Sequence, residues 1–209
     1  MAYQSPVRTQ EIDLYAATLD DPAAFRPAFH AHWNERLPWV ELADGLPRHR
    51  TPRRLSPDED AGAVLALIRR SFAFMDARID PPSSMHRLTT EAIARQARDG
   101  EVWVIEETGA PVACVFLTPK PGRLYIGKLA VDEAFRRQGL SRQLVALAED
   151  RARALGLGLL ELEVRIELTE NHRMFEGMGF ARSAETSHEG YDRITGITFT
   201  RPVARPGAG

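Results

Sequence analysis

The chain has 209 residues, of which 44% are apolar, enough for the core of one domain of ordinary size together with an extension. The formal net charge of −2 argues against a protein that binds nucleic acid or an anionic membrane through bulk charge. The single cysteine, Cys114, excludes an intrachain disulfide and a cysteine zinc site, and without an apolar leader or a membrane-length apolar run we expect a protein of the reducing cytoplasm.

Residues 1–50 are expected to form an N-terminal extension, because the segment 44–52 is rich in proline, glycine and charge. Within it, the stretches TLDDP, His30 to Trp33 and LPWVELADGLP resemble the C-terminal end of the glutathione-dependent formaldehyde-activating family, over residues 13–49. The zinc-binding cysteines of that family are absent, so none of its chemistry is implied. The extension is either a remnant that now serves as a packing arm or dimer contact, or a family-specific addition whose similarity is fortuitous. His30 and His32 are read as surface histidines, and no metal is expected.

Two helices are expected next. The segment RRLSPDEDAGAVLALIRRSFAFM predicts a short strand and then a helix, with Ser56 as the N-cap and Pro57 in the first helical position. The segment TTEAIARQARDG predicts a second helix, capped by Thr89 or Thr90 and stopped by Gly100.

Three strands with hairpin turns follow, EVWVIEE, PVACVFLT and RLYIGKLAV, with Thr108-Gly109 as the first turn. A helix that begins at Gly139 is ended by Gly156 and Gly158. The alternating segment LLELEV predicts another strand, residues 169–178 a short helix, and FARSAE and DRITGITFT two final strands. The proline- and glycine-rich tail, 203–209, is expected to be disordered.

The junction LAVDEAFRRQGLS has the features of a pyrophosphate site. An apolar strand enters an arginine-bearing turn, and a glycine then opens an amphipathic helix. The start of a helix leaves backbone N–H groups unpaired and carries partial positive charge, so it attracts an anion. Gly139 allows close approach of the backbone, and Arg136, Arg137 and Arg142 add positive charge.

This turn, Arg136-Arg137-Gln138-Gly139-Leu140-Ser141, resembles the acetyl-CoA signature of the GCN5-related N-acetyltransferase (GNAT) family, with Ser141 as a small departure from Gly or Ala. The segment Glu163 to Phe180, EVRIELTENHRMFEGMGF, resembles the family's second conserved patch. The resemblance covers residues 52–202. It implies an α/β (α+β) fold: a mixed, mostly antiparallel sheet, splayed between its fourth and fifth strands, with helices on both faces.

The resemblance also implies roles for residues. The backbone of Leu129, Ala130 and Val131 would pair with the pantetheine arm of acetyl-CoA, and the N–H of Ala130 or Leu129 would polarise the thioester carbonyl. The turn from Arg136 to Arg142, which also includes Gln138 and Leu140, would hold the pyrophosphate. Asn171 is a candidate cofactor contact; the alternative is a helix residue that satisfies local backbone groups.

Two positions depart from the family pattern. Phe175 stands where many members have a tyrosine that protonates the leaving thiolate, and Leu168 stands where an asparagine is common. Phe175 has no proton to give, so the thiolate leaves unaided, or another group or a water protonates it.

The general base is the least constrained assignment. Glu163 lies on the strand that borders the cleft, and we expect it to act through a water. Glu161, Glu106 and Asp132 are further candidates, and for each carboxylate the alternative is a solvated surface group. His172 and His188 are candidate substrate contacts, with a structural or solvated histidine as the alternative.

The sequence therefore predicts an N-acetyltransferase that moves an acetyl group from acetyl-CoA to a primary amine in a ternary complex. The acceptor is a small molecule or a peptide, with no nucleic acid, membrane or metal involved. The alternative is a catalytically weak acyl-CoA-binding sensor. A homodimer is expected from the resemblance alone.

Overall fold

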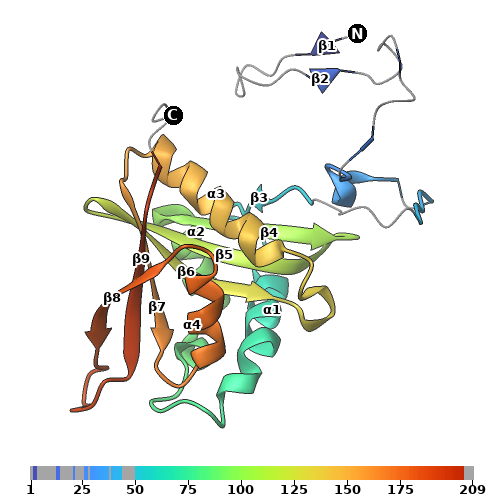
Figure 1. Ribbon diagram of the computed structural model, residues 1–209. Helices are drawn as coiled ribbons and strands as arrows, with labels where there is room; N and C mark the ends of the chain where they lie inside the picture. Colours follow the sequence, from blue (N-terminus) through green and yellow to red (C-terminus); the bar gives the residue numbers. More distant parts are fainter. Residues whose placement is uncertain are drawn as a thin grey trace. The chain divides into compact units, whose positions relative to one another are not determined.

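The computed structural model describes residues 2–3, 13–14, 21, 26–27, 29–37, 39–43 and 50–204 (Figure 1). It divides into two compact units, residues 1–49 and 50–209, which are considered one at a time. In the described part of the chain, no helix is long and apolar enough to cross a bilayer. The predicted boundary segment up to residue 49 and most of the tail, 205–209, lie outside the described residues.

The first unit contains two short paired strands, β1 (Ala2–Tyr3) and β2 (Asp13–Leu14), and a 3-10 turn, η3 (Trp33–Glu35). Arg36 stacks on the ring of Trp33 at 4.3 Å. His32 lies 3.1 Å from the carboxylate of Glu35, and both side chains are exposed. The described residues hold no cluster of three or more potential metal ligands.

The second unit is built on a seven-stranded mixed sheet. Its strand order is β3 (Arg53–Arg54), β4 (Glu101–Glu107), β5 (Ala110–Lys120), β6 (Arg123–Val131), β7 (Leu159–Arg165), β9 (Gly196–Pro202) and β8 (Ala181–Thr186). Every neighbouring pair is antiparallel except β6 and β7, which are parallel. The predicted mixed, mostly antiparallel sheet is thereby confirmed.

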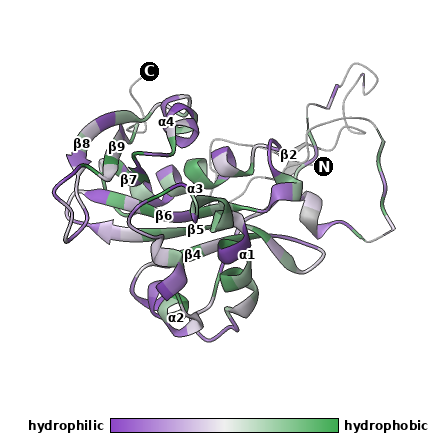
Figure 2. Cartoon of the chain, turned by 90° about the horizontal axis from the view of Figure 1, so that it is seen from below, coloured by the Kyte–Doolittle hydropathy of each residue, from purple (hydrophilic) through white to green (hydrophobic). Residues whose placement is uncertain are grey.

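Helices cover both faces of this sheet, as predicted (Figure 1). One face packs against α1 (Gly62–Phe72) and α2 (Thr90–Asp99), and the other against α3 (Leu140–Ala154) and α4 (Thr169–Glu176). Short 3-10 turns occur at η4 (Ala73–Met75), η5 (Ser84–Arg87) and η6 (Glu133–Phe135). The strand β5 between them is hydrophobic along most of its length, because both of its faces are covered (Figure 2).

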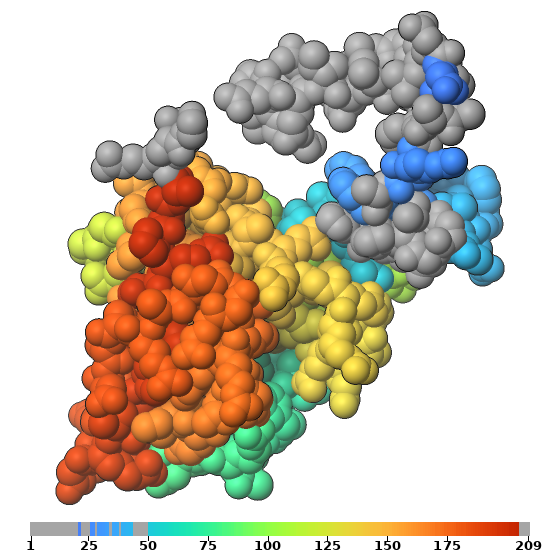
Figure 3. Space-filling model, in the orientation of Figure 1, coloured from blue at the N-terminus to red at the C-terminus, as the bar shows by residue number. Residues whose placement is uncertain are grey.

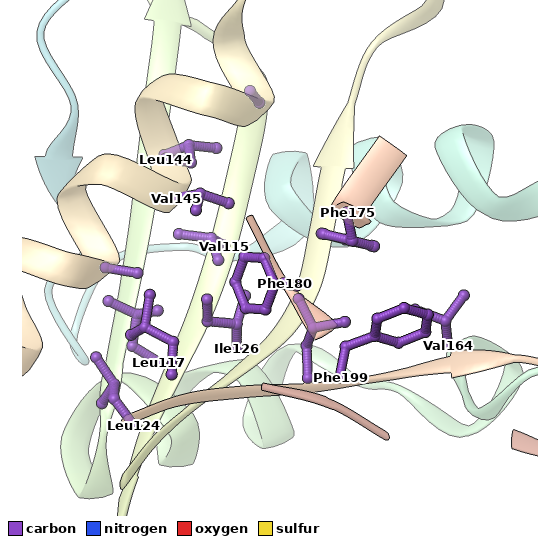
Figure 4. Close-up of a cluster of buried hydrophobic side chains, with 14 of the residues drawn as sticks. Val115, Leu117, Leu124, Ile126, Leu144, Val145, Val164, Phe175, Phe180 and Phe199 are labelled. Atoms are coloured by element: carbon purple, nitrogen blue, oxygen red, sulfur yellow. The ribbon is translucent and has the colours of Figure 1, made fainter. Parts of the chain in front are cut away.

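The larger core cluster lies on the α3 and α4 face (Figure 4). Leu144 and Val145 of α3 pack over the sheet there, and Phe175 of α4 meets Phe180 edge-on with ring centroids 5.8 Å apart. The alternation predicted for β7 is confirmed, since Leu160, Leu162 and Val164 are buried in this cluster.

Local chemistry explains most of the boundaries. Thr89 accepts a hydrogen bond from the Ala92 N–H and caps α2, which ends at Gly100, as predicted. Thr108 and Gly109 both have positive φ, which gives the predicted two-residue hairpin turn between β4 and β5.

Two predicted boundaries were wrong. Ser56 does not cap α1, because it closes a separate turn in which its N–H donates to the Glu59 carboxylate, and the helix begins six residues later at Gly62. The last strand begins at Gly196 rather than at Asp192, because the residues before it form a loop in which Thr195 bonds to His188.

The pairing of β6 with β7 stops early. Only Arg123, Leu124 and Tyr125 of β6 have partners on β7, and β7 continues in register with β9. On its other side β6 carries a bulge, where Lys128 and Leu129 lie opposite the single residue Val115 of β5, and Lys128 has a φ of 46°. A bulge bends a strand, so β6 and β7 separate beyond Tyr125. The predicted splay between the fourth and fifth strands is confirmed.

Cys114 lies fully buried in the centre of β5, where burial raises the pKa of its thiol to about 12. Because the thiolate is the reactive form, roughly one molecule in ten thousand would carry it at pH 8. We expect no reaction with a chromogenic thiol reagent in the native protein and one equivalent in denaturant. Rapid titration of a thiol in the native protein would contradict the described burial.

Candidate functional site

A cavity of about 1530 Å³ opens where β6 and β7 separate. Its walls come from the unpaired parts of these two strands, the first turns of α3 and α4, and residues 73–88, the segment that follows α1. In the space-filling view a hollow lies between the loop before α3, drawn in yellow, and the α4 region, drawn in orange (Figure 3). Strand backbone, two helix starts and several charged side chains therefore meet around one cavity.

The turn before α3 forms one end of the cavity. Arg137 and Gly139 both have positive φ, at 62° and 82°, and α3 begins at Leu140 without a side-chain cap. The first-turn N–H groups of α3 therefore have no intrahelical carbonyl partner. The structure brings to this wall most residues predicted for a pyrophosphate: Arg136, Arg137, Gly139, Leu140, Ser141 and Arg142.

Gln138 is the exception within that turn, because its side chain does not line the cavity. Its amide nitrogen donates to the carbonyl of Ala134 at 3.4 Å, and its amide oxygen accepts from Arg50 Nη1 at 3.2 Å. Gln138 therefore belongs to the support of the turn.

Arg50 is the centre of that support and is only 5% exposed. Its Nε donates to Glu107 Oε2 at 2.6 Å, and its guanidinium lies 5.3 Å from the ring centroid of Phe135. Its main-chain carbonyl accepts a hydrogen bond from the side chain of Gln143 in α3. One buried arginine thus joins β4, the turn before α3, and α3 itself.

On the β6 wall, Leu129 and Val131 line the cavity, whereas the Ala130 side chain is buried on the α1 and α2 face. Ala130 is paired with Cys114 in the ladder with β5, and Leu129 lies in the bulge without a one-to-one partner. Of the two backbone positions predicted to polarise a carbonyl, Leu129 is the one released from regular pairing.

On the β7 wall, Glu163 lines the cavity and is exposed to it. Its carboxylate lies over Gly196 of β9, where an added Cβ would come within 2.6 Å of Glu163 Oε1. Glycine at 196 therefore makes room for the present position of this carboxylate.

The other predicted base candidates lie outside the cavity lining and are held in ion pairs. Glu161 lies 2.9 Å from Arg123 and 3.2 Å from Lys120. Glu106 binds Arg53 at 2.6 Å. Arg70 Nε donates to Asp132 Oδ2 at 2.7 Å, and this hydrogen bond holds the pKa of Asp132 below its usual range. Glu163 is the one candidate among the four that lines the cavity.

Residues of α4 form the opposite wall. Asn171 and Phe175 both line the cavity, and Phe175 is largely buried against Phe180. His172 between them is buried, with its Nε2 2.9 Å from the carbonyl of Arg165 and its ring 5.5 Å from that of Phe199. His172 is therefore a structural residue.

His188 does line the cavity, but both ring nitrogens are engaged. Its Nδ1 lies 2.6 Å from Thr195 Oγ1 and its Nε2 lies 3.3 Å from Arg165 Nη1. Since arginine is a donor, Nε2 must accept, which assigns the proton to Nδ1.

Tyr125 and Lys128 also line the cavity, and no sequence motif predicted a role for either residue. Burial, together with the charges of Glu163 and Glu161, raises the pKa of Tyr125 to about 12, so its phenol stays protonated. Lys128 points into the cavity because of the bulge in β6, a feature that strand periodicity does not reveal.

Ion pairs connect the segment after α1 to the far side of the opening. Arg78 binds Glu170 of α4 at 2.5 Å, and Asp80 binds Arg193 at 2.7 Å and Tyr191 at 2.9 Å. These groups are exposed, so each contact contributes modestly to stability. Together they hold segment 73–88 across the end of the cavity.

Comparison with known proteins identifies relatives of this architecture. A sequence model described as the acetyltransferase (GNAT) family matches residues 63–180. The chain is 32% identical over 77 residues to N-alpha-acetyltransferase 30 of Saccharomyces cerevisiae, a match that covers 34% of this chain and 44% of the relative. The matched part thus spans less than half of that relative.

Two solved structures share the fold. The ribosomal-protein-S18-alanine N-acetyltransferase of Escherichia coli is 20% identical with a TM-score of 0.53, over 76% of this chain and 97% of that one. A chain of the NatC complex bound to Gag peptide and CoA is 21% identical with a TM-score of 0.52, over 74% and 98%.

The position of Arg50 generates a prediction about the turn before α3. Arg50→Lys keeps the charge but loses the planar fork that reaches both Glu107 and Gln138. Because a hydrogen bond to a charged group contributes about 1.5–3 kcal/mol, we expect amide exchange at 133–139 to accelerate about tenfold or more. Hydrogen–deuterium exchange read by mass spectrometry measures this. The control is Arg69→Lys on the exposed face of α1, and equal protection in the two variants would refute the anchoring role.

Proposed function

The chain belongs to the GNAT acetyltransferase family, and from this premise we propose that it transfers an acetyl group from acetyl-CoA to a primary amine by direct attack in a ternary complex. The observation that carries the proposal is the cavity between β6 and β7, which joins the uncapped start of α3 to Glu163. One end suits a pyrophosphate and the other offers a carboxylate for an incoming amine.

Acetyl-CoA is proposed to bind along the β6 wall. The N–H groups of the turn, from Arg137 to Arg142, and the side chains of Arg136, Arg137 and Arg142 would hold the pyrophosphate. Backbone groups of Leu129, Ala130 and Val131 would pair with the pantetheine arm, because that edge of β6 has no partner on β7. Asn171 and Phe175 would contact the cofactor from α4. The side chain of Gln138 would act only through the support of the turn. No metal is needed for this chemistry.

The protein's part in the reaction is mainly to position the reactants. Glu163, acting through a water, would remove a proton from the attacking ammonium. The N–H of Ala130 or Leu129 would stabilise negative charge developing on the thioester oxygen, and the unpaired position of Leu129 in the bulge supports the latter. Phe175 offers no proton, so the thiolate would leave as the anion or take a proton from water.

The acceptor is proposed to be the α-amine of a polypeptide. The yeast relative is named as an N-alpha-acetyltransferase, which supports this choice over a small amine. We further propose that residues 51–202 form the catalytic domain and residues 1–50 an extension, whose last residue, Arg50, supports the turn before α3. Residues 203–209 are proposed as a tail, and a homodimer as the assembly.

Phe175 also favours a second candidate, an acyl-CoA-binding sensor with little turnover. The two functions separate in one experiment: acetyl-CoA titration by calorimetry, followed by free-thiol release across a panel of amines. Binding with release supports the enzyme, whereas binding without release on any amine supports the sensor.

Gly139→Asp is expected to weaken acetyl-CoA binding at least about tenfold, because a carboxylate would repel the pyrophosphate from the start of α3. Gly122→Asp is the matched control: it has a similar positive φ, 73° against 82°, and equally open surroundings, but lies in the β5–β6 turn outside the cavity. Calorimetry compares the two. Equal affinity in both variants would remove the pyrophosphate assignment.

Glu163→Gln is expected to lower kcat by about 100-fold or more and to abolish the acidic limb of the pH–rate profile, since a general base commonly contributes that much. Glu161→Gln, two residues away on the same face of β7, serves as the control because its carboxylate is tied to Arg123 and Lys120. An acidic limb that survives in the Glu163 variant would show that another group is the base.

A further inference from the structure

Positive charge gathers in a second place in the cavity, away from the turn before α3. Lys128, on the bulge of β6, and Arg87, at the end of η5, both line the cavity wall formed by β6 and the segment after α1. The proposed pyrophosphate site does not use these two residues. They therefore need a separate explanation.

The two cations are close enough to repel each other. Burial and the charge of Arg87 lower the pKa of Lys128, and no carboxylate contributes in the opposite direction. Lys128 Nζ donates to Ser84 Oγ at 2.6 Å, a neutral partner. Placing like charges together at a partly buried position costs free energy unless an anion balances them.

Two other cations of this cavity, which lie outside the turn before α3, have carboxylates close to them. Arg78 binds Glu170, and Arg165 lies 3.7 Å from Glu167. Within residues 50–204, neither Lys128 nor Arg87 forms an ion pair. This charge distribution favours an anionic ligand group that would bind Lys128 and Arg87.

The place of Lys128 relates this anion to the acceptor. Tyr125 and Glu161 form the last pair between β6 and β7, where strands lie about 4.8 Å apart. Lys128 and Glu163 follow three and two residues later, on opposite walls of the narrow part of the opening. A group bound by Lys128 would therefore be a near neighbour of an amine at Glu163.

We propose that Lys128 and Arg87 bind a carboxylate adjacent to the acceptor amine, so that the enzyme selects acidic acceptors. The inference rests on the proposed acetyl transfer. For the polypeptide acceptor proposed above, the carboxylate is the side chain of a first-position Asp or Glu. The main-chain carboxylate of a free amino acid has the same chemistry, and the test distinguishes the two sources. In either case Lys128 and Arg87 determine specificity and take no part in proton transfer.

The test compares kcat/KM for isosteric acceptors. Peptide amides that begin with Glu, Gln, Asp, Asn or Lys report on the side-chain source, and free alanine against alanine amide reports on the main-chain source. Charge-assisted hydrogen bonds lead us to expect a preference of about tenfold to a hundredfold for the acidic member of a pair.

Arg87→Gln and Lys128→Gln should each reduce that ratio of kcat/KM values, and the double variant should bring it close to one. Arg98→Gln, an exposed cation of α2 outside the cavity, should leave the ratio unchanged.

The outcomes separate this inference from the acetyl-transfer proposal. Each variant is first checked for acetyl-CoA affinity equal to that of the wild type, which establishes an intact fold. If Lys128→Gln is unstable, Arg87→Gln alone still tests the inference, because Arg87 is exposed and its replacement leaves the core unchanged. Turnover with equal rates within both kinds of pair, the acidic and neutral peptides and free alanine against alanine amide, or a ratio unmoved in both variants, overturns the inference and leaves the enzyme proposal standing. If no amine is turned over, calorimetry of the Glu and Gln peptides on the CoA-bound protein decides: tighter binding of the Glu peptide supports the carboxylate site, and equal or absent binding overturns it.

Discussion

The structure depends on the point at which β6 and β7 stop pairing. Backbone N–H and C=O groups on the facing edges of two strands need partners, and beyond Tyr125 these strands do not supply them to each other. The bulge at Lys128 and the continued pairing of β7 with β9 keep the edges apart. An extended ligand with amide groups is therefore a natural occupant of the gap, and the surrounding elements arrange charge around that occupant.

The charges divide by face of the sheet. On the α3 side, the start of a helix and three arginines gather at one end of the gap. On the α1 side, Lys128 and the segment after α1 form the other end, and Glu163 stands between. This division allows two ligands to approach one reaction point from opposite sides, which is what direct transfer in a ternary complex requires.

Sequence reasoning recovered the parts of the molecule that are governed by local chemistry. The turn at Thr108-Gly109, the cap at Thr89 and the alternation of β7 each follow from a few neighbouring residues. Gly139 at the start of α3 could also be predicted, because a helix start with positive φ and no side-chain cap favours glycine.

What the sequence did not reveal depends on partners far along the chain. Serine is favoured at a helix N-cap, but the N–H of Ser56 donates to the Glu59 carboxylate in a separate turn. Glu161 and Glu163 look equivalent on β7, and only the positions of Lys120 and Arg123 separate a paired carboxylate from one that faces the cavity. Lys128 lines the cavity because of the bulge in β6, and no local sequence motif predicts that bulge.

The anchor at Arg50 bears on how this domain can be shortened or joined to other proteins. Arg50 precedes the first strand of the sheet by three residues and belongs to no helix or strand, so a boundary drawn at β3 would discard it without removing any regular element. Such a boundary would keep every strand of the sheet, but the turn before α3 would lose its main buried support. A fusion or a truncated version intended for crystallisation should therefore begin upstream of Arg50.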